Sequence, residues 1–281
     1  MTTLQNRTEI PADTRDVPSR VPGQPTRFQR HRGWVLGSAA LIAVLAVWQL
    51  LVGQFQLVGQ LVLPTPWVIA QRIGGLLASG DFWYNLGVSG KSFAIGFGLA
   101  VVVGLLVGLA MGWFPVVQSI CDPFVNFLNS TPRIALAPLF VIWFGIGIWS
   151  KVAVIFFGAV FPIIITTMAG VRNLDPALLR AARAFGATPL QLFRTVAMPG
   201  AVPYIISGFR LAVAHALTGV VVGEFIAARA GVGLIMVRAA QVYDTPTVFA
   251  GVVIVAALGL AFTQGLRVLE KRFQAWKPAT N

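Results

Sequence analysis

Charged residues and cysteines are scarce in this chain of 281 residues. Only 11% of the residues are charged, 57% are hydrophobic, and the mean hydropathy is +0.79. These values lie outside the range of soluble domains, so the sequence predicts an all-α protein that crosses a membrane several times. The single cysteine, Cys121, excludes an internal disulfide and cannot form a redox pair by itself.

Acidic residues are also rare, at nine against 21 lysines and arginines, which gives a net charge of +12. In a membrane protein, basic residues collect on the cytoplasmic side, which accounts for this charge without a nucleic-acid partner. Six arginines precede the first apolar run, four basic residues lie from Arg172 to Arg194, and four lie from Arg267 to Lys277. We therefore expect both termini in the cytoplasm.

Long apolar runs divide the chain. The membrane domain is expected at 33–272, with spans at 34–52, 91–112, 123–146, 151–171, 203–227 and 247–268. Residues 1–32 have no apolar run and are expected to be a disordered basic cytoplasmic tail, and 273–281 a second cytoplasmic tail. Pro64 and Pro66 open a probable amphipathic helix on the outer side.

A polar, basic stretch from 175 to 200 interrupts the spans. Asp175 and Pro176 are typical of a helix N-cap and first residue, and Gly186 is typical of a helix end. Thr188 and Gln191 form a capping-box pattern that begins a second short helix. We expect Pro199 and Gly200 to end this helix. Its apolar residues, which would need a partner surface, are Leu190, Leu192, Phe193, Val196 and Ala197.

The spacing of this stretch resembles the cytoplasmic coupling loop of permease subunits of bacterial ATP-binding-cassette importers. The family motif is Glu-Ala-Ala, three residues, Gly, nine residues, Ile, one residue and Leu-Pro. The matching positions here are Arg180, Ala181, Ala182, Gly186, Val196, Met198 and Pro199. Arg180 reverses the charge of the motif glutamate. The resemblance implies docking on an ATPase subunit, for which we single out Leu192, Phe193 and Val196. An ordinary helix-turn-helix loop between spans is the alternative.

The third expected span carries a group of polar residues. Helical spacing places Asn126, Asn129, Ser130 and Arg133 on one face, with a helix break at Pro132. We hypothesise that this face lines a translocation path and favours an anion, since an arginine in the membrane should face the protein interior. The alternative is that the polar residues form hydrogen bonds between helices and that Arg133 is structural.

Three polar residues stand out in the fifth expected span. His215 and Thr218 share a face and are candidates for the path, although a lone histidine is more often a packing residue. Glu224 lies near the outer end. We expect it to hold an outer gate through Arg229 or Arg238, because a carboxylate would repel an anionic substrate.

The segment 135–147, Ala-Leu-Ala-Pro-Leu-Phe-Val-Ile-Trp-Phe-Gly-Ile-Gly, narrows the resemblance. It is similar to the permeases that import nitrate, sulfonates, taurine, bicarbonate and some aromatic or pyrimidine compounds. Gly208, Arg210 and Leu211, and the later run 231–234, support it. The resemblance implies a six-helix type I importer fold in the bacterial inner membrane. It also implies a second permease copy, as a homodimer, two ATPase subunits, and a periplasmic or lipid-anchored binding protein.

A nucleotide site is not expected in this chain. Gly90, Lys91 and Ser92 mimic the end of a phosphate-binding loop, but Asn85 occupies the position of its first glycine. We therefore expect no enzyme activity and no cofactor here, with ATP and Mg²⁺ bound by a partner ATPase that drives alternating access. No metal site is expected either. A stand-alone secondary transporter or channel, or a membrane scaffold, remains the alternative class.

Overall fold

The computed structural model describes residues 27–56, 59 and 61–273, and in these ranges every regular element is a helix. The elements, in chain order, are α1 (Arg27–Gln49), η1 (Leu50–Gln54), α2 (Pro66–Leu77), α3 (Gly80–Trp113), α4 (Pro115–Ser130), α5 (Arg133–Phe144), α6 (Ile148–Arg172), α7 (Pro176–Ala184), α8 (Pro189–Leu192), η2 (Phe193–Ala197), α9 (Met198–Ala227), α10 (Val232–Gln241) and α11 (Thr245–Phe273). The two η elements are single π-helical turns.

Five helical stretches are long and apolar enough to cross a membrane: 35–54, 80–113, 148–172, 189–227 and 245–268. The sixth candidate is the pair α4 and α5, which bends by 103° at a short break and counts as one span if the pair is taken together. The break falls at Thr131 and Pro132, where a helix break was predicted, because proline cannot continue the hydrogen-bond ladder. The expected third span is therefore bent rather than straight.

The core lies where α3, α6 and α9 pack together. Ala100 on α3, Ile155 and Ile163 on α6, and Ala212 on α9 are all fully buried there. Glycines on α3 allow the close approach, because a Cβ at Gly104 would lie 2.7 Å from an Ile163 side-chain carbon. Small residues of this kind let membrane helices pack backbone to backbone.

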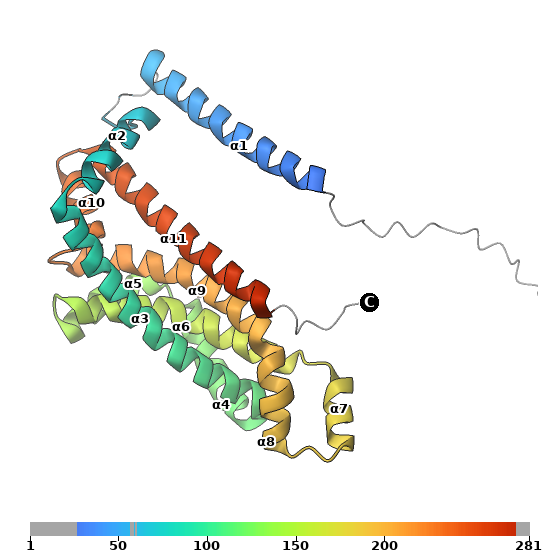
Figure 1. The fold of residues 1–281 in the computed structure, drawn as a ribbon. Helices are drawn as coiled ribbons and strands as arrows, with labels where there is room; N and C mark the ends of the chain where they lie inside the picture. Colours follow the sequence, from blue (N-terminus) through green and yellow to red (C-terminus); the bar gives the residue numbers. More distant parts are fainter. Residues whose placement is uncertain (1–26, 57–58, 60, 274–281) are drawn as a thin grey trace, which may run out of the picture.

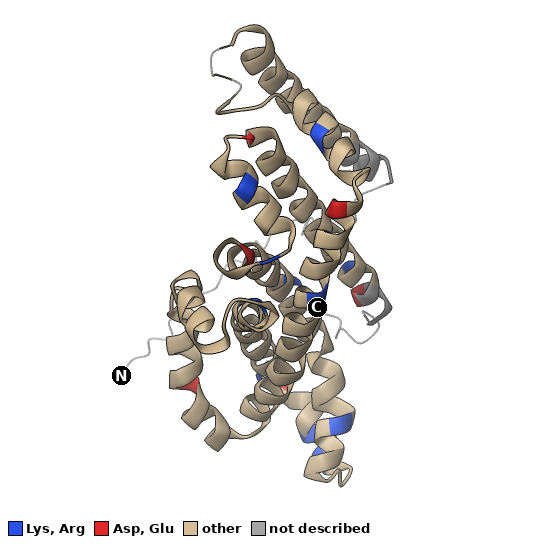
Figure 2. Cartoon of the chain, turned by 90° about the vertical axis from the view of Figure 1, so that its left-hand side faces the viewer, with Lys and Arg blue, Asp and Glu red and all other residues tan. Residues whose placement is uncertain are grey.

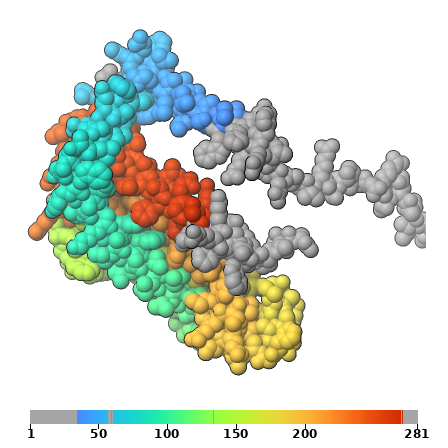
Figure 3. Space-filling model, viewed as in Figure 1, coloured from blue at the N-terminus to red at the C-terminus, as the bar shows by residue number. Residues whose placement is uncertain are grey.

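The N-terminal helix stands apart from this core. Only 6% of the most apolar part of the first span is buried. Figure 3 shows α1 separated from the rest of the bundle along most of its length. Residues 27–32, expected in the disordered tail, instead form the first turns of α1, because residues compatible with helix continue directly into the apolar run. Residues 1–26 and 274–281, the rest of the expected tails, lie outside the described residues.

The bundle has two ends that differ in what they carry. The turn formed by α7 and α8 projects from one end, which we call the loop end, while α2 and α10 lie at the other, which we call the far end (Figure 1). Figure 2 shows few charged residues along the long helices. The helix α2 was predicted from Pro66, and Thr65 caps it by accepting from the Val68 N–H.

Candidate translocation path and coupling loop

The first half of the loop folds as its sequence predicts. The Asp175 carboxylate accepts a hydrogen bond of 2.7 Å from the Ala177 N–H, which caps α7. Gly186 has a φ of 79°, the left-handed conformation that glycine adopts most readily, and it follows the last turn of α7. The Ala187 N–H then donates to the Ala182 carbonyl at 3.1 Å, which closes the helix end.

The second half of the loop corrects one expectation. The capping box of Thr188 and Gln191 is present, with bonds of 2.8 and 3.3 Å. However, Pro199 does not end the helix, because α8, η2 and α9 form one apolar stretch, Pro189–Ala227. The π turn at Phe193–Ala197 precedes the proline, and we attribute the continuity to this wider turn, which relieves the clash of the ring with the preceding carbonyls.

The apolar residues chosen for ATPase docking do not all face outward. Leu192 is only 3% exposed, so the expectation that it contacts a partner is wrong. Phe193 packs on Trp113 of α3, with ring centroids 5.2 Å apart, and joins a small core at the loop end. The large apolar side chains that are exposed are Phe185 at 93%, Leu190 at 59%, Leu178 at 49% and Met198 at 45%. They now form the candidate docking surface.

The other motif positions differ in their exposure to solvent. Arg180 and Ala181 are exposed, whereas Ala182, Val196 and Pro199 are half-buried. The motif alanines therefore lie on a helix with one open face. Figure 3 shows the yellow and orange loop projecting from the body of the molecule. The loop is thus accessible from outside the chain, as a coupling element must be.

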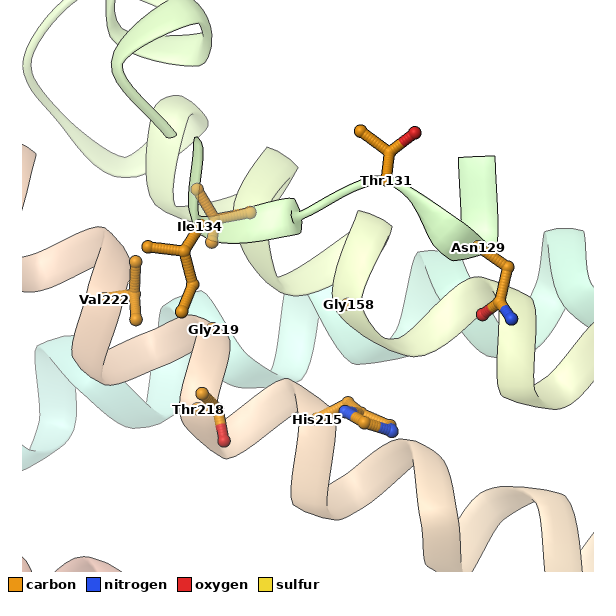
Figure 4. A pocket seen from close by; sticks show the side chains of 9 residues that line it. Asn129, Thr131, Ile134, Gly158, His215, Thr218, Gly219 and Val222 are labelled. Atoms are coloured by element: carbon orange, nitrogen blue, oxygen red, sulfur yellow. The ribbon is translucent and has the colours of Figure 1, made fainter. Parts of the chain in front are cut away.

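A cavity of about 260 Å³ lies beside the break between α4 and α5, against α6 and α9 (Figure 4). Its lining comes from four helices and the break, and comprises Asn129, Thr131, Ile134, Val154, Gly158, His215, Thr218, Gly219 and Val222. In Figure 4, Asn129 and Ile134 point from the α4 and α5 side toward α9. The lining combines polar groups with a branched aliphatic wall.

The cavity brings together three of the six predicted path residues, Asn129, His215 and Thr218. Asn126 and Ser130 are exposed and do not line it. The prediction that Arg133 shares their helix face is wrong, because α4 ends at Ser130 and Arg133 begins α5 beyond the 103° bend. The side chain of Arg133 lies outside the described residues.

Two glycines that the sequence analysis missed form the floor of the cavity. A Cβ at Gly158 on α6 would lie 3.0 Å from the His215 carbonyl, and one at Gly219 on α9 would lie 3.0 Å from the Ile155 Cα. The α6 and α9 backbones therefore cross in direct contact at the cavity. Glycines recurring in facing apolar spans were the available signal.

The threonine hydroxyls of the lining have their protons engaged. Thr131 donates to the Phe127 carbonyl at 2.9 Å, and Thr218 donates to the Ala214 carbonyl at 3.0 Å. Each hydroxyl proton is thus bound by a carbonyl of its own helix, and the Thr131 hydroxyl points away from α9 (Figure 4). The side chains of Asn129 and His215 add an amide and an imidazole to the lining.

Glu224 has different partners from those expected. It is completely buried and accepts hydrogen bonds from Ser89 Oγ at 2.8 Å, the Gly233 N–H at 2.8 Å and Lys151 Nζ at 3.4 Å. The prediction of Arg229 or Arg238 as its partner is therefore wrong. A lysine placed in an otherwise apolar span, Lys151, was the signal that the sequence analysis overlooked.

A second ionic contact lies at the far end, where α2 meets the start of α11. Arg72 donates to the Asp244 carboxylate at 2.8 Å, and Thr247 bonds to the same carboxylate through its backbone and its hydroxyl. Burial raises the pKa of Asp244, but the Thr247 hydrogen bonds and the Arg72 charge lower it by more. The pKa therefore lies below its ordinary value.

A bundle of apolar helices with a cavity between them and an exposed two-helix loop at one end fits the permease class of membrane protein. Residues 100–275 match the family model described as "Binding-protein-dependent transport system inner membrane component". The chain is 32% identical over 268 residues to a putative aliphatic sulfonates transport permease of Bacillus subtilis, covering 95% of each chain. It is also 32% identical to a taurine transport system permease of Escherichia coli, covering 89% of this chain and 92% of that one. The chain belongs to this family of inner-membrane importer permeases.

Solved structures agree on the fold. A bacterial alginate ABC transporter, in complex with an alginate pentasaccharide-bound periplasmic protein, matches 89% of this chain and 98% of its own, with a TM-score of 0.56 and 15% identity. The MetNI methionine transporter in an inward-facing form matches 77% of this chain and 99% of its own, with a TM-score of 0.50 and 22% identity. The chain therefore has the type I importer permease fold that the resemblance implied.

Proposed function

We propose that this chain forms the membrane path of an ATP-driven importer, with its loop end in the cytoplasm and its far end facing outward. The observation that carries the proposal is the exposed loop. Phe185 is 93% exposed although it is a large apolar side chain in a polar loop. An apolar side chain held out in this way is stabilised when another protein covers it.

The proposed substrate is a small organic anion of the sulfonate type. Similar permeases are named for aliphatic sulfonates, for taurine and for formylaminopyrimidine. Among the described residues, the cavity lining holds no acidic side chain that would repel an anion. Asn129 and His215 offer polar groups, and Ile134, Val154 and Val222 offer an aliphatic wall for a short carbon chain.

The proposed partners follow the importer architecture. Two ATPase subunits bind ATP and Mg²⁺ and dock on the loops of two identical copies of this chain. A periplasmic or lipid-anchored binding protein delivers the substrate at the far end. Closure of the ATPases moves α7 and α8, and because α8 continues through η2 into α9, that movement passes directly to a wall of the cavity.

The test begins with purification of the chain in mild detergent from its own host. We expect an ATPase subunit to copurify, with vanadate-sensitive ATP hydrolysis. Reconstituted vesicles should take up labelled taurine or an alkanesulfonate only when ATP and the binding protein are present. Phe185→Asp should abolish copurification, because a charge would be buried at the docking surface. Tyr243→Asp, at a position that is 76% exposed at the far end, serves as the matched control.

Two outcomes would count against the proposal. Recovery of a stable oligomer free of any ATPase would favour a secondary transporter or channel. Full ATPase recovery with Phe185→Asp would show that the docking surface lies elsewhere.

A further inference from the structure

The start of α10 is held entirely by side chains of other helices. Its first backbone N–H groups have no partner within the helix. The three bonds are Gly231 N–H to Asn85 Oδ1 at 2.7 Å, Val232 N–H to Ser89 Oγ at 2.9 Å, and Gly233 N–H to Glu224 Oε2 at 2.8 Å. Two of these acceptors belong to α3 and one to α9. The orientation of α10 is therefore fixed by the spans and not by its own loop.

A buried ion pair completes this arrangement. Lys151 on α6 donates to Glu224 at 3.4 Å and to the Ala230 carbonyl at 3.1 Å. The two charged side chains are only 4% and 0% exposed. We call Asn85, Ser89, Lys151 and Glu224 the far-end clamp. The clamp joins α3, α6, α9 and the start of α10 through hydrogen bonds and one ion pair.

The clamp leaves α10 no room to shift toward α9. A Cβ at Gly231 would lie 2.2 Å from the Glu224 carboxyl group, and one at Gly233 would lie 2.8 Å from the Glu224 Cβ. Gly231 also has a φ of 144°. Buried ion pairs contribute little net stability compared with apolar packing, and their best-attested use is to fix one arrangement. The far-end clamp therefore specifies position.

The clamp also acts on the helix that leads to the loop end. Glu224 lies near the end of the apolar stretch that runs without a break from Pro189 to Ala227. At 1.5 Å per residue, Glu224 and Leu192 are about 48 Å apart along this stretch. Only the π turn at Phe193–Ala197 departs from regular α-helix between them. The start of α10 and the loop helix α8 are thus joined through one continuous helical stretch.

We infer that the far-end clamp is the point at which an event on the outer face enters α9, and that Glu224 is the positioning residue that couples α10 to the loop. The inference rests on the proposed function, in which a binding protein docks at the far end. According to this inference, the clamp transmits the docking signal and takes no part in ATPase docking. Loss of the clamp should therefore lower the stimulated ATPase rate without lowering the basal rate.

The test uses the permease and ATPase complex in lipid nanodiscs. ATP hydrolysis is measured without and with the substrate-binding protein of the proposed importer, saturated with taurine or an alkanesulfonate. The double variant Lys151→Met with Glu224→Leu removes both charges and the acceptor, and so leaves no unpaired buried charge. We expect the stimulation by the binding protein to fall about tenfold, which is typical of a lost coupling between two sites. The basal rate and ATPase recovery should stay unchanged.

Two further variants decide the result. Arg72→Gln, the matched control, breaks a far-end ion pair that does not touch α9 and should keep the stimulation. Ser89→Ala removes only the hydroxyl between Val232 and Glu224, and it tests the inference even if the double variant fails to assemble. Stimulation at the wild-type level in Ser89→Ala, or in an assembled double variant, would overturn the inference. Failure of the wild-type complex to bind an ATPase would instead overturn the proposed function.

Discussion

The two ends of α9 are built on opposite principles. At the far end, Glu224 is completely buried and bonded to groups of three other elements. At the loop end, the helix continues through a π turn into a loop whose Phe185 is 93% exposed. The two buried charges of the first region have their partners inside the chain, whereas the second region leaves a large apolar side chain without cover.

The difference shows which end of α9 is held by contacts within the chain and which end needs a partner. Hydrogen bonds to charged, buried groups are directional and admit one arrangement, so the far end is rigid. Apolar contact is not directional, so an exposed apolar loop can follow a partner that moves. A helix joined firmly to α10 at one end and covered by a partner at the other is suited to carry movement through a membrane.

The largest effect is expected where the far end loses one charge. Glu224→Leu leaves Lys151 buried without its counter-ion and should destabilise the chain by about 3–5 kcal/mol. Thermal unfolding of the purified complex in detergent measures this. The exchanged pair, Lys151→Glu with Glu224→Lys, should not restore stability, because an ammonium group cannot accept the Gly233 N–H bond. Recovery in the exchanged pair would show that charge alone matters.

A smaller loss of stability is expected at the loop end, and it should differ between two phenylalanines. Phe193 packs on Trp113, so Phe193→Ala should cost about 2 kcal/mol, less than for a fully buried phenylalanine. Phe185→Ala should change stability by less than about 0.5 kcal/mol, because an exposed side chain loses no packing. Thermal unfolding of the permease alone measures both values. Equal losses would mean that Phe185 is packed within this chain after all.

The sequence predicts those features that depend on neighbouring residues. The cap of α7 at Asp175, the capping box at Thr188 and the left-handed Gly186 each need only a few consecutive positions, and all three are confirmed. Five of the six expected apolar spans are confirmed for the same reason, since length and composition suffice. The break at Pro132 is also local, because proline lacks the donor that a helix requires.

Features that depend on distant residues were predicted poorly. The partner of Glu224 lies 73 positions away, so the sequence shows a lysine in an apolar span but does not show which acidic residue it meets. Leu192 and the exposed Leu190 share one short apolar pattern, so only the packing of α8 against the bundle distinguishes them. Pro199 was expected to end a helix because the π turn that accommodates it has no simple sequence signature. Half of the predicted path residues line the cavity, since the bend after Ser130 redirects the chain.

The smallest effect is expected at the partly exposed far-end pair, Arg72 and Asp244. Their side chains are 48% and 32% exposed, so Asp244→Asn should cost less than about 1 kcal/mol. Because the folded pKa of Asp244 lies below its unfolded value, the contribution of this carboxylate is complete above about pH 4 and is lost as the pH falls through the lowered pKa. The difference in Tm between the wild type and Asp244→Asn should therefore be constant from about pH 5 to 8 and shrink below about pH 4. If the Tm of the wild type rose relative to that of Asp244→Asn as the pH fell, the carboxylate would be destabilising when charged. The stabilising polar contacts of the far end would then be confined to the buried clamp.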